Sequence, residues 1–173
     1  MNIQLSVLDQ SPLLQGHNEQ DALAQTIELA KHVDRLGYKR FWMSEHHSTK
    51  SLAGSAPEIL VSAIAAQTKH IRVGTGGVLL PHYSPYKVAE TFRVLEGLYP
   101  GRIDLGIGRA PGGMPGVNYA LNRGEYPDVH SYPTQVSHLI DYLIGNSPEG
   151  YEVKATPLGE TIPPVFMLGS SGG

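Results

Sequence analysis

The strongest constraint on the fold of this chain is a regular alternation of strand-like and helix-like segments. Short, apolar and β-prone runs recur along the 173 residues, and stretches with apolar side chains at helical spacing lie between them. The first four runs begin 31 to 36 residues apart. This alternation predicts parallel βα units joined by right-handed crossovers. The five predicted strands are IQLSVLD (3–9), KRFWMS (39–44), IRVGTG (71–76), RIDLGIG (102–108) and PVFMLG (164–169).

The predicted helices carry recognisable start and stop signals. A helix is predicted over 21–36, with Asn18 as its N-cap and Gly37 as its stop. The stretch SAPE (55–58) has the pattern of a capping box, a Ser three residues before a Glu, and is predicted to open a second helix. Ser84 directly precedes a proline and is predicted to cap a third helix.

The last third of the chain departs from this period. Residues 110–132 are rich in Gly, Pro, Tyr and Asn, which predicts a long loop insertion after the fourth strand. A fourth helix is predicted over 134–144, and a small hairpin within 147–163.

Two α/β architectures fit repeated βα units: an open doubly wound sheet and a (β/α)8 TIM barrel. The turn after the first strand contains no GxGxxG, which weakens the dinucleotide-binding alternative. Polar or Gly-rich residues instead follow the strands, at the face where barrels place their chemistry. A full barrel has eight strands and typically ~250 residues. About five βα units in residues 1–173 therefore predict a single, apparently truncated domain that forms a partial barrel.

Composition excludes several classes of function. The formal net charge is -3 and no Lys/Arg cluster is present, so nucleic-acid binding is not expected. The chain has no Cys, which excludes disulfides and thiolate metal sites. No apolar run approaches the ~18 residues of a membrane span and no signal peptide opens the sequence. We expect a cytoplasmic protein with no membrane partner.

The stretch WMSEHHS (42–48) places Glu45, His46 and His47 at the end of the second strand. Adjacent residues point in different directions there, and HExxH spacing is absent, so a shared metal is disfavoured. Two alternatives stay open. The histidines belong to an ordinary polar loop, or one imidazole binds a cofactor or substrate and transfers a proton near neutral pH.

Three further positions are candidates, each with an ordinary structural alternative. Gly76 and Gly77 would let a flat ligand approach the backbone, or they form a tight turn. Arg109 leaves the fourth strand and suits a phosphate or carbonyl-rich ring, or it forms a surface salt bridge. Ser170 and Ser171 could offer hydroxyls to a phosphate, or they belong to a flexible terminus.

Taken together and in this order, these motifs resemble the bacterial luciferase-like flavin-dependent monooxygenases. The resemblance spans essentially the whole chain, but it corresponds to the N-terminal half of the family's (β/α)8 barrel. The stretches that carry it are LGYKRFWMSEHHS (36–48), IRVGTGGVLLPHYSPYKVAE (71–90), LYPGRIDLGIGRAPGG (98–113) and PPVFMLGSSGG (163–173).

The resemblance implies an enzyme that binds FMN, or alternatively a deazaflavin, at the carboxyl ends of the strands. Such enzymes receive reduced flavin from a separate reductase and use dioxygen to oxidise a small organic substrate. By the same resemblance, a non-proline cis peptide is expected at Gly76–Gly77 or one residue further on. His46 and Glu45 match catalytic positions. The matched cofactor positions are His47, Gly76, Gly77, Arg109, Ser170 and Ser171, and no metal is implied.

A partial barrel has consequences for partners and function. Five parallel strands would leave two unpaired edges and an exposed apolar inner face, so a homodimer or a complementing C-terminal half is expected. Part of the phosphate loop and its helix would also be missing. The alternative function is therefore a truncated, catalytically inactive flavin-binding or assembly subunit. A metal hydrolase that uses His46 and His47 is a third alternative.

Overall fold

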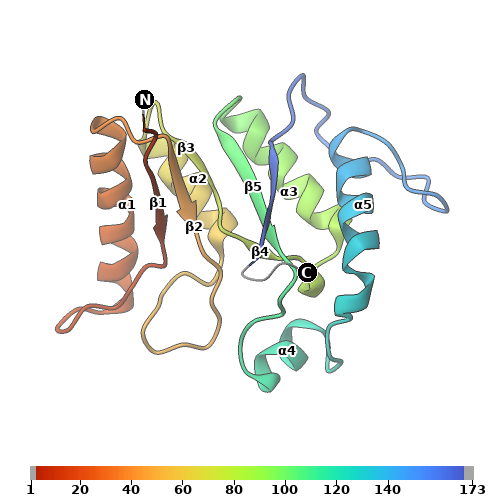
Figure 1. Cartoon of the computed structure of the whole chain (residues 1–173), viewed down its shortest axis with the longest axis horizontal. Helices are drawn as coiled ribbons and strands as arrows, with labels where there is room; N and C mark the ends of the chain where they lie inside the picture. The colour runs from red at the N-terminus through yellow and green to blue at the C-terminus, as the bar shows by residue number, and fades with distance from the viewer. Residues whose placement is uncertain (1–2, 170–173) are drawn as a thin grey trace.

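The computed structural model describes residues 3–169 and shows an α/β fold in which helices cover one face of a parallel sheet (Figure 1). Helices α1 and α5 lie at the two sides of the sheet, with α2 and α3 behind it. The strands are β1 (Ser6–Asp9), β2 (Arg40–Met43), β3 (Arg72–Thr75), β4 (Val78–Leu79), β5 (Ile103–Gly108) and β6 (Val165–Leu168). The helices are α1 (Glu19–Arg35), α2 (Pro57–Gln67), η1 (Leu80–His82), α3 (Pro85–Leu98), α4 (Pro115–Leu121), η2 (Val129–Ser131) and α5 (Tyr132–Leu143).

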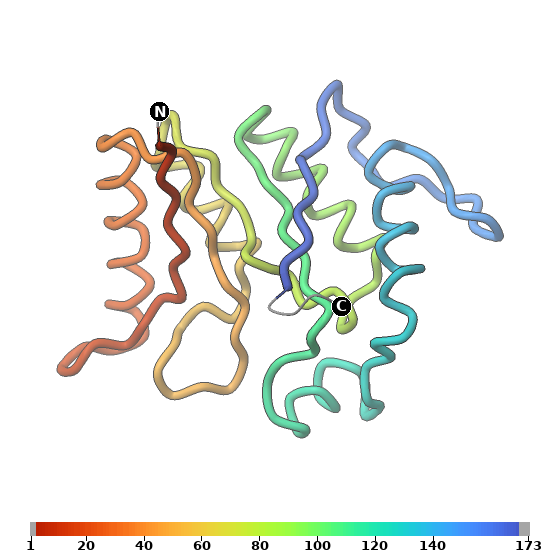
Figure 2. The backbone as a smooth tube through the Cα atoms, viewed as in Figure 1, coloured from red at the N-terminus to blue at the C-terminus, as the bar shows by residue number. Residues whose placement is uncertain are grey.

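The sheet follows the order of the chain from β1 to β6, and every strand pair is parallel. Figure 2 shows this order across the sheet, from the red first strand through orange, yellow and green to the blue last strand. β5 pairs with β3 and β4 along one edge and with β6 along the other. Within residues 3–169, β1 and β6 each pair with a single strand, so the predicted partial barrel is confirmed as a curved sheet that does not close.

The edge of β5 that faces β3 and β4 contains a one-residue offset. Gly74 pairs with Asp104, and Val78 pairs with Ile107, so four steps along one strand match three along the other. The peptide bond Gly76–Gly77, which lies within this offset, is cis. The extra residue separates β3, which lies within the predicted strand 71–76, from β4, which the sequence did not predict.

At this offset the side chain of Thr75 makes hydrogen bonds to the backbone of β5. Its buried hydroxyl donates to the carbonyl oxygen of Gly106 at 2.8 Å and accepts from the Gly106 N–H at 3.1 Å. A Cβ atom at Gly106 would overlap the Thr75 carbonyl oxygen. β5 therefore passes so close to Thr75 that only glycine fits at position 106.

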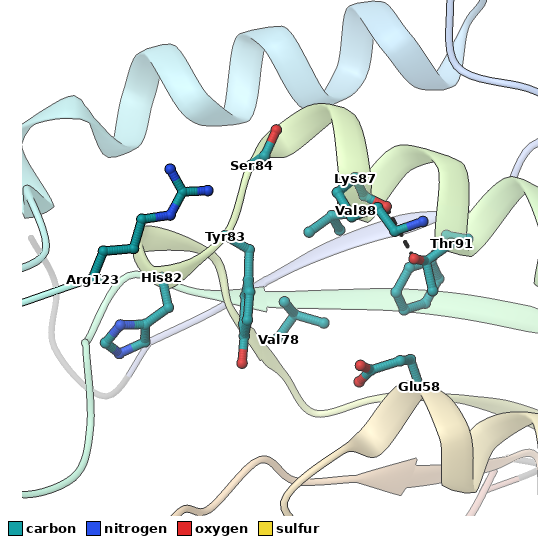
Figure 3. A pocket seen from close by; sticks show the side chains of 10 residues that line it. Glu58, Val78, His82, Tyr83, Ser84, Lys87, Val88, Thr91 and Arg123 are labelled. Carbon is teal, nitrogen blue, oxygen red and sulfur yellow. Dashed lines mark hydrogen bonds between the residues drawn. The ribbon is translucent and has the colours of Figure 1, made fainter. Parts of the chain in front are cut away.

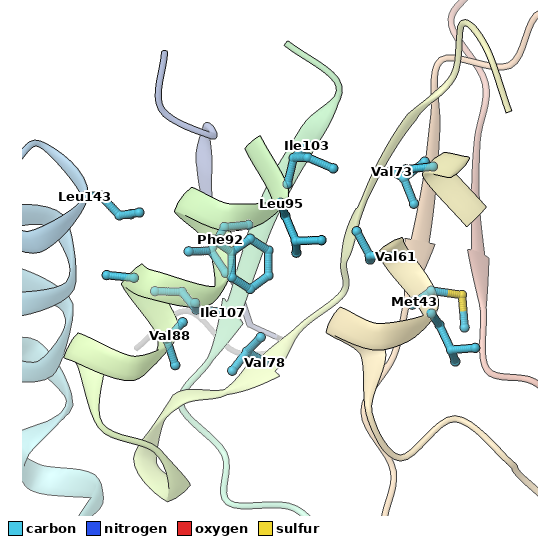
Figure 4. Close-up of a cluster of buried hydrophobic side chains, with 14 of the residues drawn as sticks. Met43, Val61, Val73, Val78, Val88, Phe92, Leu95, Ile103, Ile107 and Leu143 are labelled. Carbon is cyan, nitrogen blue, oxygen red and sulfur yellow. The ribbon is translucent and has the colours of Figure 1, made fainter. Parts of the chain in front are cut away.

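The core lies between the sheet and the helices (Figure 4). Alternate residues of each strand point toward it, as the period of two requires. Phe41 and Met43 of β2 are fully buried there, and Phe92 and Leu95 of α3 pack into the same cluster. No helix within residues 3–169 is both long enough and apolar enough to cross a membrane.

The structure confirms some of the predicted helix caps and contradicts others. Asn18 is confirmed as the N-cap of α1, where it forms a reciprocal capping box with Asp21. Gly37 follows the helix with a φ of +77°, as the predicted stop requires. The capping box over 55–58 is wrong, because α2 begins at Pro57 and its N-cap residue makes no side-chain bond. Ser84 is the N-cap residue of α3, but its side chain makes no capping bond.

The long loop predicted over 110–132 needs correction. It contains the helix α4, which starts at Pro115, and the turn η2, and α5 begins at its last residue. Proline has a φ suited to the first helical turn, so a Pro-rich composition there does not exclude a helix.

The hairpin predicted within 147–163 is also wrong, because no strand occurs among those residues. The buried Arg93 binds this region instead. Its guanidinium donates to the carbonyl oxygens of Tyr142 and Pro157, at 3.1 and 3.0 Å, and also to that of Leu143. Of these three acceptors only Pro157 belongs to 147–163, whereas Tyr142 and Leu143 are the last residues of α5, so the Arg93 side chain links this segment to the end of the helix.

The start of β3 is held by the side chain of Asp34, which lies at the end of α1. Its carboxylate accepts the backbone N–H groups of Lys69, His70 and Ile71 at 2.8, 3.0 and 2.8 Å. Burial raises the pKa of Asp34, but these hydrogen bonds outweigh it, and the net pKa lies below its ordinary value.

Asp34→Asn is expected to lower the free energy of unfolding at pH 7 by about 1 kcal/mol, because the charge-assisted bonds are lost. A carboxyl group with a lowered folded pKa stabilises above its unfolded pKa and loses this contribution as pH falls through the folded value. The difference from wild type, measured by urea unfolding, should therefore shrink between pH 7 and pH 3. Glu149→Gln at an exposed position is the control. A difference that is independent of pH would contradict this account.

Gly106→Ala is expected to destabilise the chain by about 3 kcal/mol or more, because the Thr75 carbonyl cannot move without breaking the junction of β3 and β4. The control is Gly116→Ala in α4, where an added Cβ meets nothing within 4 Å. That change should be neutral or stabilise by up to about 1 kcal/mol. Equal unfolding midpoints for the two variants in urea would contradict the close approach.

Candidate functional site

The candidate site lies at the carboxyl ends of the strands, where the loops after β2, β4 and β5 meet. A cavity of about 470 Å³ opens between them, which is within the range of small-molecule sites. The loop after β2 lines one side, and the loop after β5 lines the other. Residues on its walls include Glu45, His46, His47, Leu79, Gly112 and Met114.

Glu45 is the buried centre of this site, with only 2% of its side chain exposed. One carboxylate oxygen accepts from the Tyr83 hydroxyl at 2.5 Å and contacts His47 Nε2 at 2.7 Å. The other accepts the backbone N–H of Leu79 at 2.9 Å. A single carboxylate therefore joins the loop after β2 to β4 and to the start of α3.

These hydrogen bonds determine which atoms of His47 and Tyr83 carry a proton. Because Glu45 accepts, His47 donates from Nε2, which leaves Nδ1 of a neutral ring as an acceptor. Burial, together with the hydrogen bond to Glu45 and its charge, raises the pKa of the Tyr83 phenol. Tyr83 therefore remains a protonated donor across the physiological range.

His46 lines the cavity beside them and is half-buried. Its backbone N–H donates to the carbonyl oxygen of Gly54 at 3.0 Å, which fixes the loop. Within residues 3–169 its ring makes no hydrogen bond to another side chain, so both ring nitrogens are available to a ligand.

The cis peptide expected from the resemblance is present at Gly76–Gly77. A Cβ atom at Gly76 would lie 3.0 Å from Leu8 and 3.1 Å from Trp42. The backbone therefore passes close to the inner side of the sheet, at a point where a side chain would be crowded.

The remaining predicted residues are not brought into this cavity. Arg109 is exposed after β5 and lies close enough to Tyr132 for its charge to act on that phenol. It is absent from the cavity walls among the described residues. Ser170 and Ser171 lie outside the described residues. No three His, Asp or Glu side chains within 3–169 are grouped as metal ligands.

Tyr83 and His82 are the residues that sequence reasoning missed. His82 Nε2 contacts the Pro111 carbonyl oxygen at 2.5 Å, and Asn122 Nδ2 contacts His82 Nδ1 at 2.6 Å. These bonds attach the segment around α4 to η1. The Tyr83 ring borders a second cavity of about 320 Å³ on the side of α3 (Figure 3). The partners lie 29 to 40 residues apart in sequence, so no local pattern signals them.

Comparison with known proteins identifies the family. The family model described as luciferase-like monooxygenase matches residues 1–128. The chain belongs to this family. It is 57% identical to the uncharacterised protein YwcH of Bacillus subtilis, over 98% of this chain and 52% of that protein. It is 42% identical to the N-acetyl-S-alkylcysteine monooxygenase of the same organism, over 98% of this chain and 52% of that enzyme.

Solved structures agree with this fold. The crystal structure of apo-MsnO8 has a TM-score of 0.92 and 45% identity, and the match covers 98% of this chain and 51% of that one. A type II Baeyer–Villiger monooxygenase component from Pseudomonas putida, in complex with FMN, has a TM-score of 0.78 at 22% identity, over 96% of this chain and 51% of that one. The chain spans about half the length of the relatives it matches.

A double-mutant cycle tests the junction at Glu45. Glu45→Gln should cost about 1–3 kcal/mol of unfolding free energy and Tyr83→Phe about 1 kcal/mol, because each leaves a buried group with a weaker partner. The double variant should be more stable than the sum of the singles by about 1 kcal/mol. Tyr119→Phe at an exposed position is the control for Tyr83 and should add to Glu45→Gln without coupling. Additive effects of Glu45 and Tyr83 would show that their contact carries no energy.

Proposed function

We propose that this chain carries the flavin-facing part of an FMN-dependent oxidoreductase of the monooxygenase type, which uses reduced flavin and dioxygen on a small organic substrate. The observation that supports this most directly is the cavity at the carboxyl ends of the strands. His46 and His47 line it, and buried Glu45 orients His47. Family membership supplies the class of chemistry.

The residues around the cavity fit a flat, hydrogen-bonding ring. Gly76 and Gly77 are not among the cavity walls, and a Cβ at either glycine would meet side chains or backbone of the chain itself, so they remain candidates for a cofactor contact through the family resemblance. His46 and His47 provide polar groups on the wall, while Leu79 and Met114 provide apolar surface. FMN, when bound, supplies the electrons that activate dioxygen. A deazaflavin is the alternative cofactor.

We propose separate roles in binding and proton transfer for the side chains at this site. His46, whose ring makes no hydrogen bond within residues 3–169, is our candidate for moving a proton to or from the reacting group. His47 would contact the cofactor or substrate through Nδ1. Glu45 is almost fully buried, and we assign it to positioning His47. Arg109 and the serines at 170 and 171 remain candidates for cofactor contacts.

The reaction also needs partners. We propose a separate flavin reductase as the source of reduced FMN, and a cytoplasmic location. N-acetyl-S-alkylcysteines, the compounds named for one relative, are the first substrates to try.

A second candidate function is flavin binding without turnover. The open edges of the sheet favour it for the isolated chain, because part of the pocket wall would be absent. The two functions differ in a simple way, since only the first predicts oxidised product.

His46→Ala is expected to lower FMN-dependent oxidation of an N-acetyl-S-alkylcysteine by about 10²-fold, in line with loss of a general acid or base. Product is measured with FMN, NADH and a flavin reductase, and FMN affinity is followed by fluorescence quenching. His130→Ala, in the exposed turn η2, is the control. Equal rates for the two variants would contradict a role for His46 in proton transfer. Quenching without any product would favour the binding function.

A further inference from the structure

One carboxylate oxygen of Glu45 lies between the two cavities described above. This oxygen, Oε1, accepts from the Tyr83 hydroxyl at 2.5 Å and from His47 Nε2 at 2.7 Å. His47 lines the cavity of about 470 Å³, whereas Tyr83 lines the cavity of about 320 Å³ on the side of α3. Two hydrogen bonds that meet at one atom therefore connect a wall of the candidate site with a cavity outside it.

Glu45 is too buried for water to stabilise its charge, so hydrogen-bond donors must do so. Its side chain is 2% exposed, and within residues 3–169 its donors are Tyr83, His47 and the backbone N–H of Leu79. None of these donors is a Lys or an Arg. Loss of the Tyr83 hydroxyl would remove the shortest of the three bonds, and a buried carboxylate that loses a donor is driven toward its neutral, protonated form.

The charge of Glu45 determines which nitrogen of His47 carries the ring proton. A carboxylate only accepts, so Nε2 donates to it, and Nδ1 of the neutral ring is an acceptor. A protonated carboxyl group would donate to Nε2 instead, which moves the ring proton to Nδ1. Nδ1 has no hydrogen-bond partner among residues 3–169, so its state determines what kind of ligand group the ring can bind.

Tyr83 is held in place as a donor. Its backbone N–H donates to the carbonyl oxygen of Leu80 at 3.0 Å, and its ring lies edge to face with that of His82, with centroids 6.2 Å apart. Burial, together with the hydrogen bond to Glu45 and its charge, raises the pKa of the phenol, so the hydroxyl keeps its proton. Tyr83 therefore offers Glu45 a donor whose position and protonation are both fixed.

We propose that Tyr83 is a positioning residue of the candidate site. Its hydroxyl, acting through Glu45, keeps the His47 proton on Nε2 and so presents Nδ1 as an acceptor. The ring then selects a ligand group that offers an N–H or an O–H. The inference rests on the proposed function for its place in a reaction, but the state of His47 can be measured in the chain without flavin or substrate.

Heteronuclear NMR of the imidazole rings locates each ring proton, and His47→Gln identifies the signals of this ring. With the ring neutral, wild type should show a single tautomer that carries its proton on Nε2. Tyr83→Phe should give a mixture in which Nδ1 also carries a proton, whereas Tyr126→Phe, at an exposed position, should leave His47 unchanged. A single Nε2 tautomer in Tyr83→Phe, or a proton on Nδ1 in wild type, would overturn the inference.

Chemical rescue separates the role of the hydroxyl from that of the ring. Tyr83→Ala should leave a hole that joins the cavity on the side of α3, because the Tyr83 ring forms part of its wall (Figure 3). The small phenol p-cresol, which corresponds to the tyrosine side chain, should restore the single Nε2 tautomer of His47. Toluene has the same shape without the hydroxyl and should not restore it. Equal rescue by toluene would show that only the volume of the ring matters, and the inference would fail.

The rate of FMN-dependent oxidation connects this measurement to the reaction. Tyr83→Phe should lower the rate about tenfold, because a donor at Nδ1 no longer matches the bound group. An unchanged rate despite a changed tautomer would overturn the role of Tyr83 in the reaction. If the tautomer responds as expected but even wild type forms no product, the proposed function fails while the positioning of His47 by Tyr83 stands.

Discussion

The structure depends on the parallel register of its strands, because this places every carboxyl end at one edge of the sheet. The loops after β2, β4 and β5 meet there although they are far apart in sequence. Glu45 makes that meeting specific. Its carboxylate is buried and fully hydrogen-bonded, so it holds three segments in one arrangement. A buried carboxylate without those partners would be strongly unfavourable, and the loops are therefore linked in stability as well as in space.

The two ends of the same strands serve different purposes. The carboxyl ends hold a cavity with imidazoles on its wall, and the amino ends hold the ion pairs of Asp104 with Arg40 and Arg72. Barrels commonly separate chemistry from stability in this way. In this chain the imidazoles of the candidate site and the ion pairs of Asp104 therefore lie at opposite ends of the same strands.

The sequence predicted well whatever depends on local pattern. Apolar and β-prone runs predicted the five main strands, and Asn18 predicted the start of α1. Features decided by tertiary contact were missed. β4 has two residues and no detectable period, and Tyr83 is important only because folding brings it to Glu45. The apparent capping box at Ser55 failed because the helix starts after it, at Pro57. The Gly- and Pro-rich composition of residues 110–132 predicts a loop, but α4 forms within it.

The offset between β3 and β5 also limits how this segment can vary. The side-chain period of a strand is two, so one extra residue exchanges the two faces. Val73 points to the core before the offset, and Val78 points to it afterwards, at positions of opposite parity. Insertion of one residue between Thr75 and Val78, without a second offset, would therefore turn Val78 to the cavity side and Leu79 into the core. The length of this stretch is thus fixed by geometry.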